Sequence, residues 1–302
     1  AAAPITRRAT SATAATTAPT TAEPSGWRRA VRSPLPSRRV LDLVIQLVLG
    51  PLLVAAATLA GGRWGTGAGG VVSALPAIVG PVLLVAARRQ GASAAADVAA
   101  GTLAGLAALS AFALTYGRAA GRWSWPASLA VGWLSAAAVG ALASMTGTGL
   151  ALGLVIAVGS LALAYRGLPA AGVTVTASSC SHADLALRMG LTAALILGLG
   201  SAAEHLGPGP GGVLAALPVL ASILAAFTHT RSGGAAAAEL LRGMLRGMAG
   251  FVAFCAIVGA LVVPAGIAAA FALAVAGTLA AHGMTLTASR PAAARAISPT
   301  GW

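Results

Sequence analysis

The chain has 302 residues, of which 58% are hydrophobic and only 8% are charged. Soluble domains carry about 25% charged residues because their surfaces face water, so this composition excludes an ordinary water-soluble fold. The net charge of +13 comes from arginines in the N-terminal tail and, singly or in pairs, between apolar segments. No nucleic-acid-binding motif accompanies them, which argues against a nucleic-acid partner. The composition instead predicts an integral membrane protein. Ala- and Gly-rich segments without alternating patterns favour helices over a barrel.

Residues 1–39 are rich in Ala, Thr, Pro, Ser and Arg, a composition that predicts a disordered tail. Seven arginines precede the first hydrophobic segment. By the positive-inside rule these arginines predict a cytoplasmic N-terminus.

Nine apolar segments follow, each close to the roughly 20 residues that a helix needs to cross a bilayer. They are residues 40–60, 70–87, 97–117, 126–144, 148–166, 185–203, 211–228, 239–260 and 263–282. We therefore expect an all-α, polytopic transmembrane bundle of about nine spans. Residues 167–183 form the longest connection, and residues 284–302 form a polar C-terminal tail.

The sequence repeats itself at a constant spacing that pairs residue 69 with residue 211, here called the repeat offset. Residues 69–76 (GGVVSALP) match residues 211–218 (GGVLAALP), and the match runs without a gap from 42 and 184 to 112 and 254. The informative matches are rare residues: Asp42 with Asp184, Pro76 with Pro218, Arg89 with Arg231, Asp97 with Glu239, and Phe112 with Phe254. This predicts two tandem structural repeats, residues 40–166 and 184–283. The span count between equivalent points favours inverted copies over parallel ones.

Acidic residues are rare, and four of them form two repeat-matched pairs: Asp42 with Asp184, and Asp97 with Glu239. Ionisable groups inside spans often mark ion or proton pathways, so these acids are candidates for ion coupling. All four also stand at the beginning of an apolar run. There a carboxylate would bind the unpaired N–H groups of a helix N-terminus, so capping is the competing interpretation.

Three arginines lie deeper in the apolar segments: Arg188, Arg242 and Arg246. They are candidate contacts for an anionic substrate or a lipid phosphate, and the alternative is that they extend to the headgroup region. Arg242 and Arg246 share one helix face, and an ion pair from Glu239 to Arg242 is expected at i,i+3 spacing.

Small residues and prolines also recur in register. The glycines are Gly101 and Gly105 in the first copy and Gly243 and Gly247 in the second, a spacing that permits close helix packing. Pro76 and Pro218 fall inside the second span of each copy. A proline there predicts either a broken helix at a binding site or a tolerated kink.

No ligand spacing for a metal, no cofactor-binding motif and no paired nucleophile and base are present, so we expect no metal site, no cofactor and no enzyme activity. Each copy resembles small bacterial integral membrane proteins of the GlpM type in its GG-x4-LP segment, Arg-bearing turn and Gly-rich third helix. The resemblance covers residues 69–112 and 211–254. It implies a protein of the bacterial inner membrane.

Tandem repeats with a substrate path between them are typical of secondary transporters. The sequence therefore favours an ion-gradient-driven transporter or exporter of small molecules, with the bilayer and a small-molecule substrate as its partners. The alternative is a non-transporting membrane scaffold or accessory subunit of a cell-envelope pathway. A second copy or another membrane protein would be the partner in that case.

Overall fold

The computed structural model describes residues 36–76, 79–145, 149–169, 181–206 and 218–288. Side chains are described only within residues 47–76, 79–143, 145, 149–169, 181–198 and 218–284. The chain divides into two units, residues 1–40 and 41–302, and all packing below lies within the second unit. The expected tails fall outside the described residues except at their helical edges, and most of the connection 167–183 falls outside them too.

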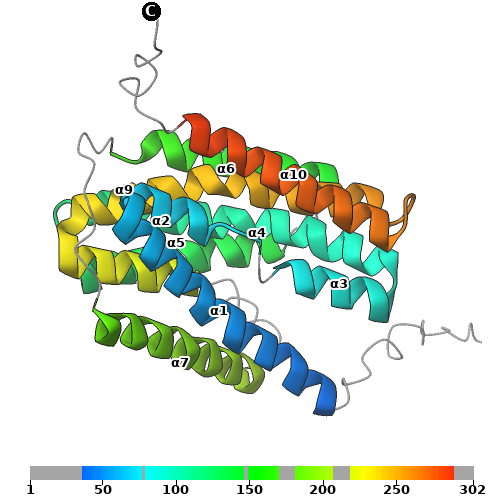
Figure 1. Cartoon of the computed structure of the whole chain (residues 1–302), viewed down its shortest axis with the longest axis horizontal. Helices are drawn as coiled ribbons and strands as arrows, with labels where there is room; N and C mark the ends of the chain where they lie inside the picture. Colours follow the sequence, from blue (N-terminus) through cyan, green and yellow to red (C-terminus); the bar gives the residue numbers. More distant parts are fainter. Residues whose placement is uncertain (1–35, 77–78, 146–148, 170–180, 207–217, 289–302) are drawn as a thin grey trace, which may run out of the picture. The chain divides into compact units, whose positions relative to one another are not determined.

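Every regular element among the described residues is an α-helix (Figure 1). The helices are α1 (Pro36–Trp64), α2 (Thr66–Ser73), α3 (Val79–Gln90), α4 (Ala92–Ala119), α5 (Trp125–Ser144), α6 (Leu150–Gly167), α7 (His182–Leu206), α9 (Val219–Leu261) and α10 (Ile267–Ala288). The all-helical prediction is therefore confirmed for the part of the chain that the structure describes.

Six of these helices are long and apolar enough to cross a membrane. They contain the segments Leu47–Trp64, Ala92–Ala119, Trp125–Ala143, Leu150–Gly167, Val219–Leu261 and Ile267–Met284. Large apolar side chains point outward from three of them, since Leu134, Leu163 and Leu279 are 64–70% exposed. Hydrocarbon is the solvent that tolerates such surfaces, so these are the helices of a multi-pass membrane protein.

The segment predicted as one span at residues 70–87 is interrupted. Helix α2 ends at Ser73, Leu75 and Pro76 are not helical, and α3 begins at Val79. Proline has no N–H to donate and its ring clashes with the carbonyl four residues earlier, so the helix stops before it. Pro218 has a related position, because α9 begins at Val219 directly after it.

Helix α9 contains a second interruption, at Gly233. This residue has φ 84° and ψ 169°, and it divides α9 into a first segment (residues 219–232) and a second segment (residues 234–261). Gly91, between α3 and α4, has nearly the same conformation, with φ 101° and ψ 166°. Side chains other than hydrogen are disfavoured at such φ, which explains a glycine at both positions.

Helix boundaries recur at the repeat offset. Gly91 and Gly233 are paired by this offset, and each precedes a helical segment of 28 residues. The same offset separates the first residues of α5 and α10, Trp125 and Ile267. It also separates the last residues of α1 and α7, Trp64 and Leu206.

Helix α4 and the second segment of α9 form the centre of the bundle and run antiparallel. A Cβ on Gly234 would collide with the carbonyl of Ala120 at one end, and a Cβ on Gly259 would contact Ala99 at the other. Fully buried side chains of both helices fill the core: Leu103, Phe112, Tyr116, Leu241 and Val258. Helices α5 and α6 pack on α4, while α2, α7 and α10 pack on α9.

Candidate functional site

The interruption between α2 and α3 and the N-terminal end of α9 line one cavity of about 380 Å³, here called the central cavity. Residues 73–75 and Val79 border it from the α2–α3 interruption, and residues 218–221 border it from the start of α9. Segments from the two halves of the chain thus meet at one partly open space. The sequence marked Pro76 and Pro218 separately, but only the fold brings the segments next to them to the same space.

The lining of the central cavity is apolar. Leu109 of α4 and Met244, Met248 and Phe251 of α9 contribute large apolar side chains. Among the described lining residues Ser73 provides the one hydroxyl, and it donates a hydrogen bond to the carbonyl of Gly70 at 2.6 Å. The described lining therefore offers no charged side chain to a ligand.

An apolar groove of about 500 Å³, the lateral groove, lies next to the central cavity. Residues of α3, α9 and α10 line this groove, among them Pro81, Phe254 and Leu279. Leu75 lines both spaces. The non-helical residues between α2 and α3 therefore separate the central cavity from the lateral groove.

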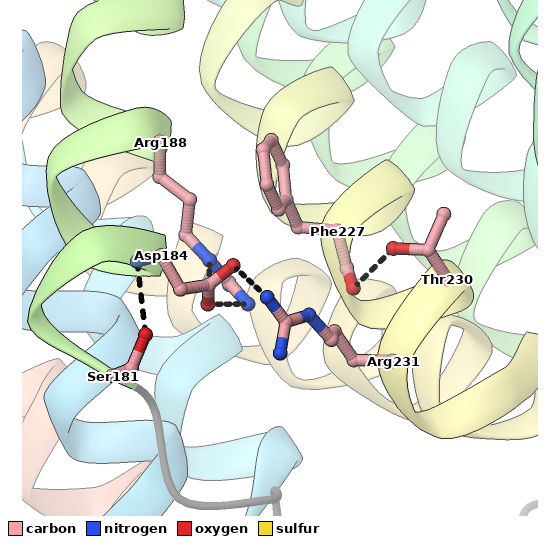
Figure 2. A network of polar contacts seen from close by, with 6 residues as sticks. All are labelled: Ser181, Asp184, Arg188, Phe227, Thr230 and Arg231. Atoms are coloured by element: carbon pink, nitrogen blue, oxygen red, sulfur yellow. Dashed lines mark hydrogen bonds and ion pairs between the residues drawn. The ribbon is translucent and has the colours of Figure 1, made fainter.

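A buried carboxylate joins α7 to the first segment of α9 (Figure 2). The Oδ2 atom of Asp184 accepts from Arg188, with Nη2 at 2.9 Å and Nε at 3.0 Å. The Oδ1 atom accepts from Nη2 of Arg231 at 2.8 Å. The side chain of Asp184 is 2% exposed, that of Arg188 9%, and that of Arg231 52%. This group is called the Asp184 cluster.

The sequence at the start of α7 explains how Asp184 is positioned. Ser181 precedes the helix, and its Oγ accepts a hydrogen bond from the backbone N–H of Asp184 at 3.2 Å. The carboxylate thus lies in the first turn, where the helix dipole favours negative charge. Arg188 lies one turn later and places its guanidinium 4.8 Å from the ring centroid of Phe227. Asp184 is therefore held both by the capped start of α7 and by its ion pairs.

Arg242 and Arg246 contact the C-terminal end of α6. Arg242 donates through Nη1 to the carbonyl of Leu168 at 2.8 Å and to that of Pro169 at 3.2 Å. Its guanidinium lies 4.4 Å from the ring centroid of Tyr165, whose hydroxyl accepts from Arg246 Nε at 2.9 Å. Cations suit the negative end of a helix dipole, so both arginines stabilise this end of α6.

The four candidate acids differ in their surroundings. Asp184 is ion-paired, Asp97 is exposed in α4, and the side chain of Asp42 lies outside the described residues. Glu239 is half-buried, and a Cβ on Gly67 would lie 3.0 Å from its Oε1, so this carboxylate faces the first turn of α2. The expected ion pair from Glu239 to Arg242 is wrong, because no such contact forms between these described side chains and Arg242 binds the end of α6 instead.

The candidate packing glycines also separate into two kinds. A Cβ on Gly243 would collide with the carbonyl of Gly67, and one on Gly247 would lie 2.7 Å from that of Val71, so both approach the α2 backbone. Around Gly101 and Gly105, an added Cβ meets no described heavy atom within 4 Å. The structure thus places one matched pair in a tight helix contact and leaves the other without a described neighbour.

Arg231, Phe227 and Tyr165 were not selected as site residues from the sequence. Arg231 carried one signal, its match with Arg89 in the repeat, and Ser181 carried another in its capping-box spacing to Asp184. Tyr165 carried none, since a tyrosine near a span end is ordinary in a membrane helix.

Comparisons with protein families, with curated proteins and with solved structures found no match to this chain. The class that the fold defines is a multi-pass helical membrane protein with an interrupted helix beside an apolar cavity. Within the described residues, no group of three or more His, Cys, Asp or Glu side chains is arranged to hold a metal ion.

Proposed function

We propose that this chain is a secondary transporter of small molecules whose pathway passes through the central cavity. The observation that carries the proposal is that the interruption between α2 and α3 and the helix start after Pro218, one from each half of the chain, line this one space. Non-helical backbone at membrane depth is tolerated where it is buried in protein or lines a cavity. Transporter sites are commonly built from such discontinuous helices at the interface between two repeats.

We further propose that the two halves are copies in opposite orientation. The recurrence of helix boundaries at the repeat offset supports the copies. The antiparallel packing of α4 on the second segment of α9, which are equivalent by that offset, supports the opposite orientation. The repeat offset also pairs cavity residues with one another, Val79 with Ala221 and Leu109 with Phe251. An inverted arrangement would place the cavity near the axis that relates the halves.

Motion of the first segment of α9 would open the cavity. The segment begins at the cavity wall with Val219 and ends at Gly233, whose φ of 84° makes it a natural hinge. Two residues before this hinge, Arg231 binds Asp184 of α7. The Asp184 cluster would therefore hold the segment in the observed position. A conformational change would have to break the ion pair between Asp184 and Arg231 or move α7 together with the segment.

Glu239 is the acid best placed to couple transport to an ion gradient. It is half-buried within a membrane-spanning helix, and no ion pair to it is formed among the described side chains. Asp184 is held by two guanidiniums, which makes release and uptake of a proton costly there. Asp97 is exposed on α4 and is not enclosed between helices as Glu239 is.

We also propose the inner membrane of a bacterium as the location, with a cytoplasmic N-terminus. The seven arginines before the first apolar segment support this orientation. Single cysteines placed at Ser93 and at Arg122, in a chain freed of its two native cysteines, test it with an impermeant thiol reagent. A cytoplasmic N-terminus predicts labelling of the Arg122 site, not the Ser93 site, from outside intact cells.

Reconstitution tests the transport proposal. Purified protein in liposomes, given an inward proton gradient and a panel of radiolabelled small molecules, should accumulate at least one of them. The matched control is Leu109→Trp, which fills the central cavity and should abolish uptake without loss of the folded protein. Absence of gradient-driven uptake for every compound would overturn the proposal.

The scaffold alternative is favoured by one observation, the absence of a described neighbour at Gly101 and Gly105 on α4. A small-xxx-small face permits close approach of another helix in lipid. In that case Gly101→Leu would abolish capture of a membrane partner, while Leu109→Trp in the cavity would leave capture unchanged. The transporter proposal instead expects Leu109→Trp to abolish uptake and Gly101→Leu to leave uptake unchanged.

A further inference from the structure

We infer that the central cavity binds an uncharged, apolar molecule that reaches it from the bilayer through the lateral groove. The inference rests on the proposed function only in treating this molecule as the transported substrate. Binding itself follows from the lining of the cavity and from its position beside the groove.

The cost of desolvation argues against a charged ligand. An ion moved into an apolar site loses several kcal/mol of hydration unless a charged partner compensates. The described lining holds no charged side chain, and the Ser73 hydroxyl hydrogen is already donated to Gly70. The charged residues of the Asp184 cluster and the arginines at the end of α6 are not among the described lining residues. A charged ligand would therefore find no counter-charge in this lining.

Water is a poor occupant of the same space. A volume of 380 Å³ corresponds to about a dozen waters at their share of liquid volume, roughly 30 Å³ each. Such waters would find few hydrogen-bonding partners on leucine, methionine and phenylalanine side chains. An apolar lining of this kind favours an apolar molecule over water. Met244 and Met248 are flexible enough to adapt to ligands of different shape.

The lateral groove supplies the route. Val275 and Leu279 of α10 line it and are 51% and 64% exposed, so the groove opens on the surface that faces hydrocarbon. Leu75 lies between the groove and the central cavity and lines both. It lies outside the regular helices, next to Pro76, and one turn-type hydrogen bond from its N–H to the carbonyl of Val72, at 3.2 Å, holds its backbone. A molecule dissolved in the bilayer would enter by displacing Leu75.

Benzophenone provides the test, because it is uncharged and apolar and it cross-links to nearby C–H bonds under ultraviolet light, with methionine favoured. The full chain in liposomes is irradiated with increasing benzophenone, and cross-linked residues are mapped by mass spectrometry. We expect saturable labelling of Met244 and Met248. Labelling of Met145 and Met284, which are 83% and 67% exposed, should rise without saturation because it reports benzophenone dissolved in lipid.

Cavity-filling variants complete the experiment. Leu109→Trp and, separately, Val79→Phe should each reduce labelling of Met244 and Met248 by about tenfold or more, equivalent to roughly 1.4 kcal/mol of lost binding. The matched control is Leu134→Trp on α5. The side chain of Leu134 is 70% exposed, so this change should leave the labelling of Met244 and Met248 unchanged. The charged analogue 4-benzoylbenzoate should not label the two cavity methionines.

Each outcome decides the inference separately from the transport proposal. Unsaturable labelling of the cavity methionines, equal labelling in the filled variants, or preference for the charged analogue would overturn the inference. Gradient-driven uptake of a polar solute together with such a result would leave the transport proposal standing. Saturable cavity labelling without any uptake would support the binding site and remove the transporter assignment.

Discussion

Asp184 and Arg231 are joined by an ion pair of 2.8 Å although 47 residues separate them in the chain. The pair connects the first turn of α7 to the first segment of α9, close to the interruption at Gly233. The carboxylate also holds Arg188, so one nearly inaccessible negative charge serves two guanidiniums. Its loss would leave Arg188 buried without a counter-charge.

We predict that Asp184→Asn destabilises the protein by about 3 kcal/mol, because removing one member of a buried pair strands the other. Arg231→Ala should cost less, about 1 kcal/mol or below, since this arginine is 52% exposed and partly screened by solvent. Thermal unfolding of the purified protein measures both. The control is Arg122→Ala, an exposed arginine outside the cluster, for which no shift of the unfolding temperature is expected. Equal stability of Asp184→Asn and the wild type would show that the cluster does not stabilise the fold.

The left-handed conformation of Gly233 leads to a second prediction. Gly233→Ala should destabilise the protein by about 1–2 kcal/mol, because an L side chain is strained at φ 84° even where space is open. Gly91→Ala should have a similar effect, since Gly91 has φ 101°. The control is Gly190→Ala in α7, where φ is helical and an added Cβ meets no atom within 4 Å. There alanine should be neutral or stabilising by up to about 1 kcal/mol. Equal effects at all three sites in unfolding experiments would contradict the role of backbone conformation.

The contact between α2 and α9 leads to a third prediction. Gly243→Ala should destabilise the protein by about 1–3 kcal/mol, because its Cβ would collide with the carbonyl of Gly67 and push α2 away. Gly105→Ala is the matched control, as the same change on α4 meets no described atom within 4 Å. Unfolding temperatures of the two variants provide the comparison. A larger loss at Gly105 than at Gly243 would count against the packing observed here.

The position of Glu239 leads to a fourth prediction. Glu239→Gln keeps the shape of the side chain but removes its titratable proton, so uptake into liposomes should no longer respond to a proton gradient. Exchange of substrate across the membrane without a gradient should persist, because the central cavity is untouched. Asp97→Asn, which alters the exposed repeat-matched acid, is the control and should retain gradient dependence. If uptake by Glu239→Gln still depends on the proton gradient, Glu239 has only a structural role, through its contact with the start of α2.

Several helices were predicted closely because their signal is local. The apolar segments 97–117 and 126–144 lie within α4 and α5, and the segments 148–166 and 263–282 lie largely within α6 and α10. Two other predicted boundaries were wrong. Residues 70–87 are not one helix, and the ten residues expected to separate 211–228 from 239–260 are helical apart from the interruption at Gly233. A single glycine or proline decides such breaks, and hydropathy averaged over a span does not detect it.

The candidate site was only partly predictable. Pro76, Pro218, Asp184, Glu239, Arg188, Arg242 and Arg246 were all selected by their rarity, their depth or their match in the repeat. Their partners were not, because Arg231, Tyr165 and the carbonyl of Leu168 are ordinary residues that become partners only when distant helices pack. The expected Glu239–Arg242 pair failed for the same reason: the end of α6 offers Arg242 two carbonyl acceptors.

The sequence by itself determined that the chain is helical and membrane-spanning, and it contained the repeat offset at which helix boundaries recur in the fold. Composition and hydropathy act over neighbouring residues, so these properties need no knowledge of the fold. Tertiary structure decided that the interruption between α2 and α3 and the helix start after Pro218 face one cavity, and that Asp184 binds Arg231. Those contacts depend on how each helix is rotated and how closely it approaches its neighbours. Glycines such as Gly234 and Gly243 set that approach through contacts with segments far away in the chain.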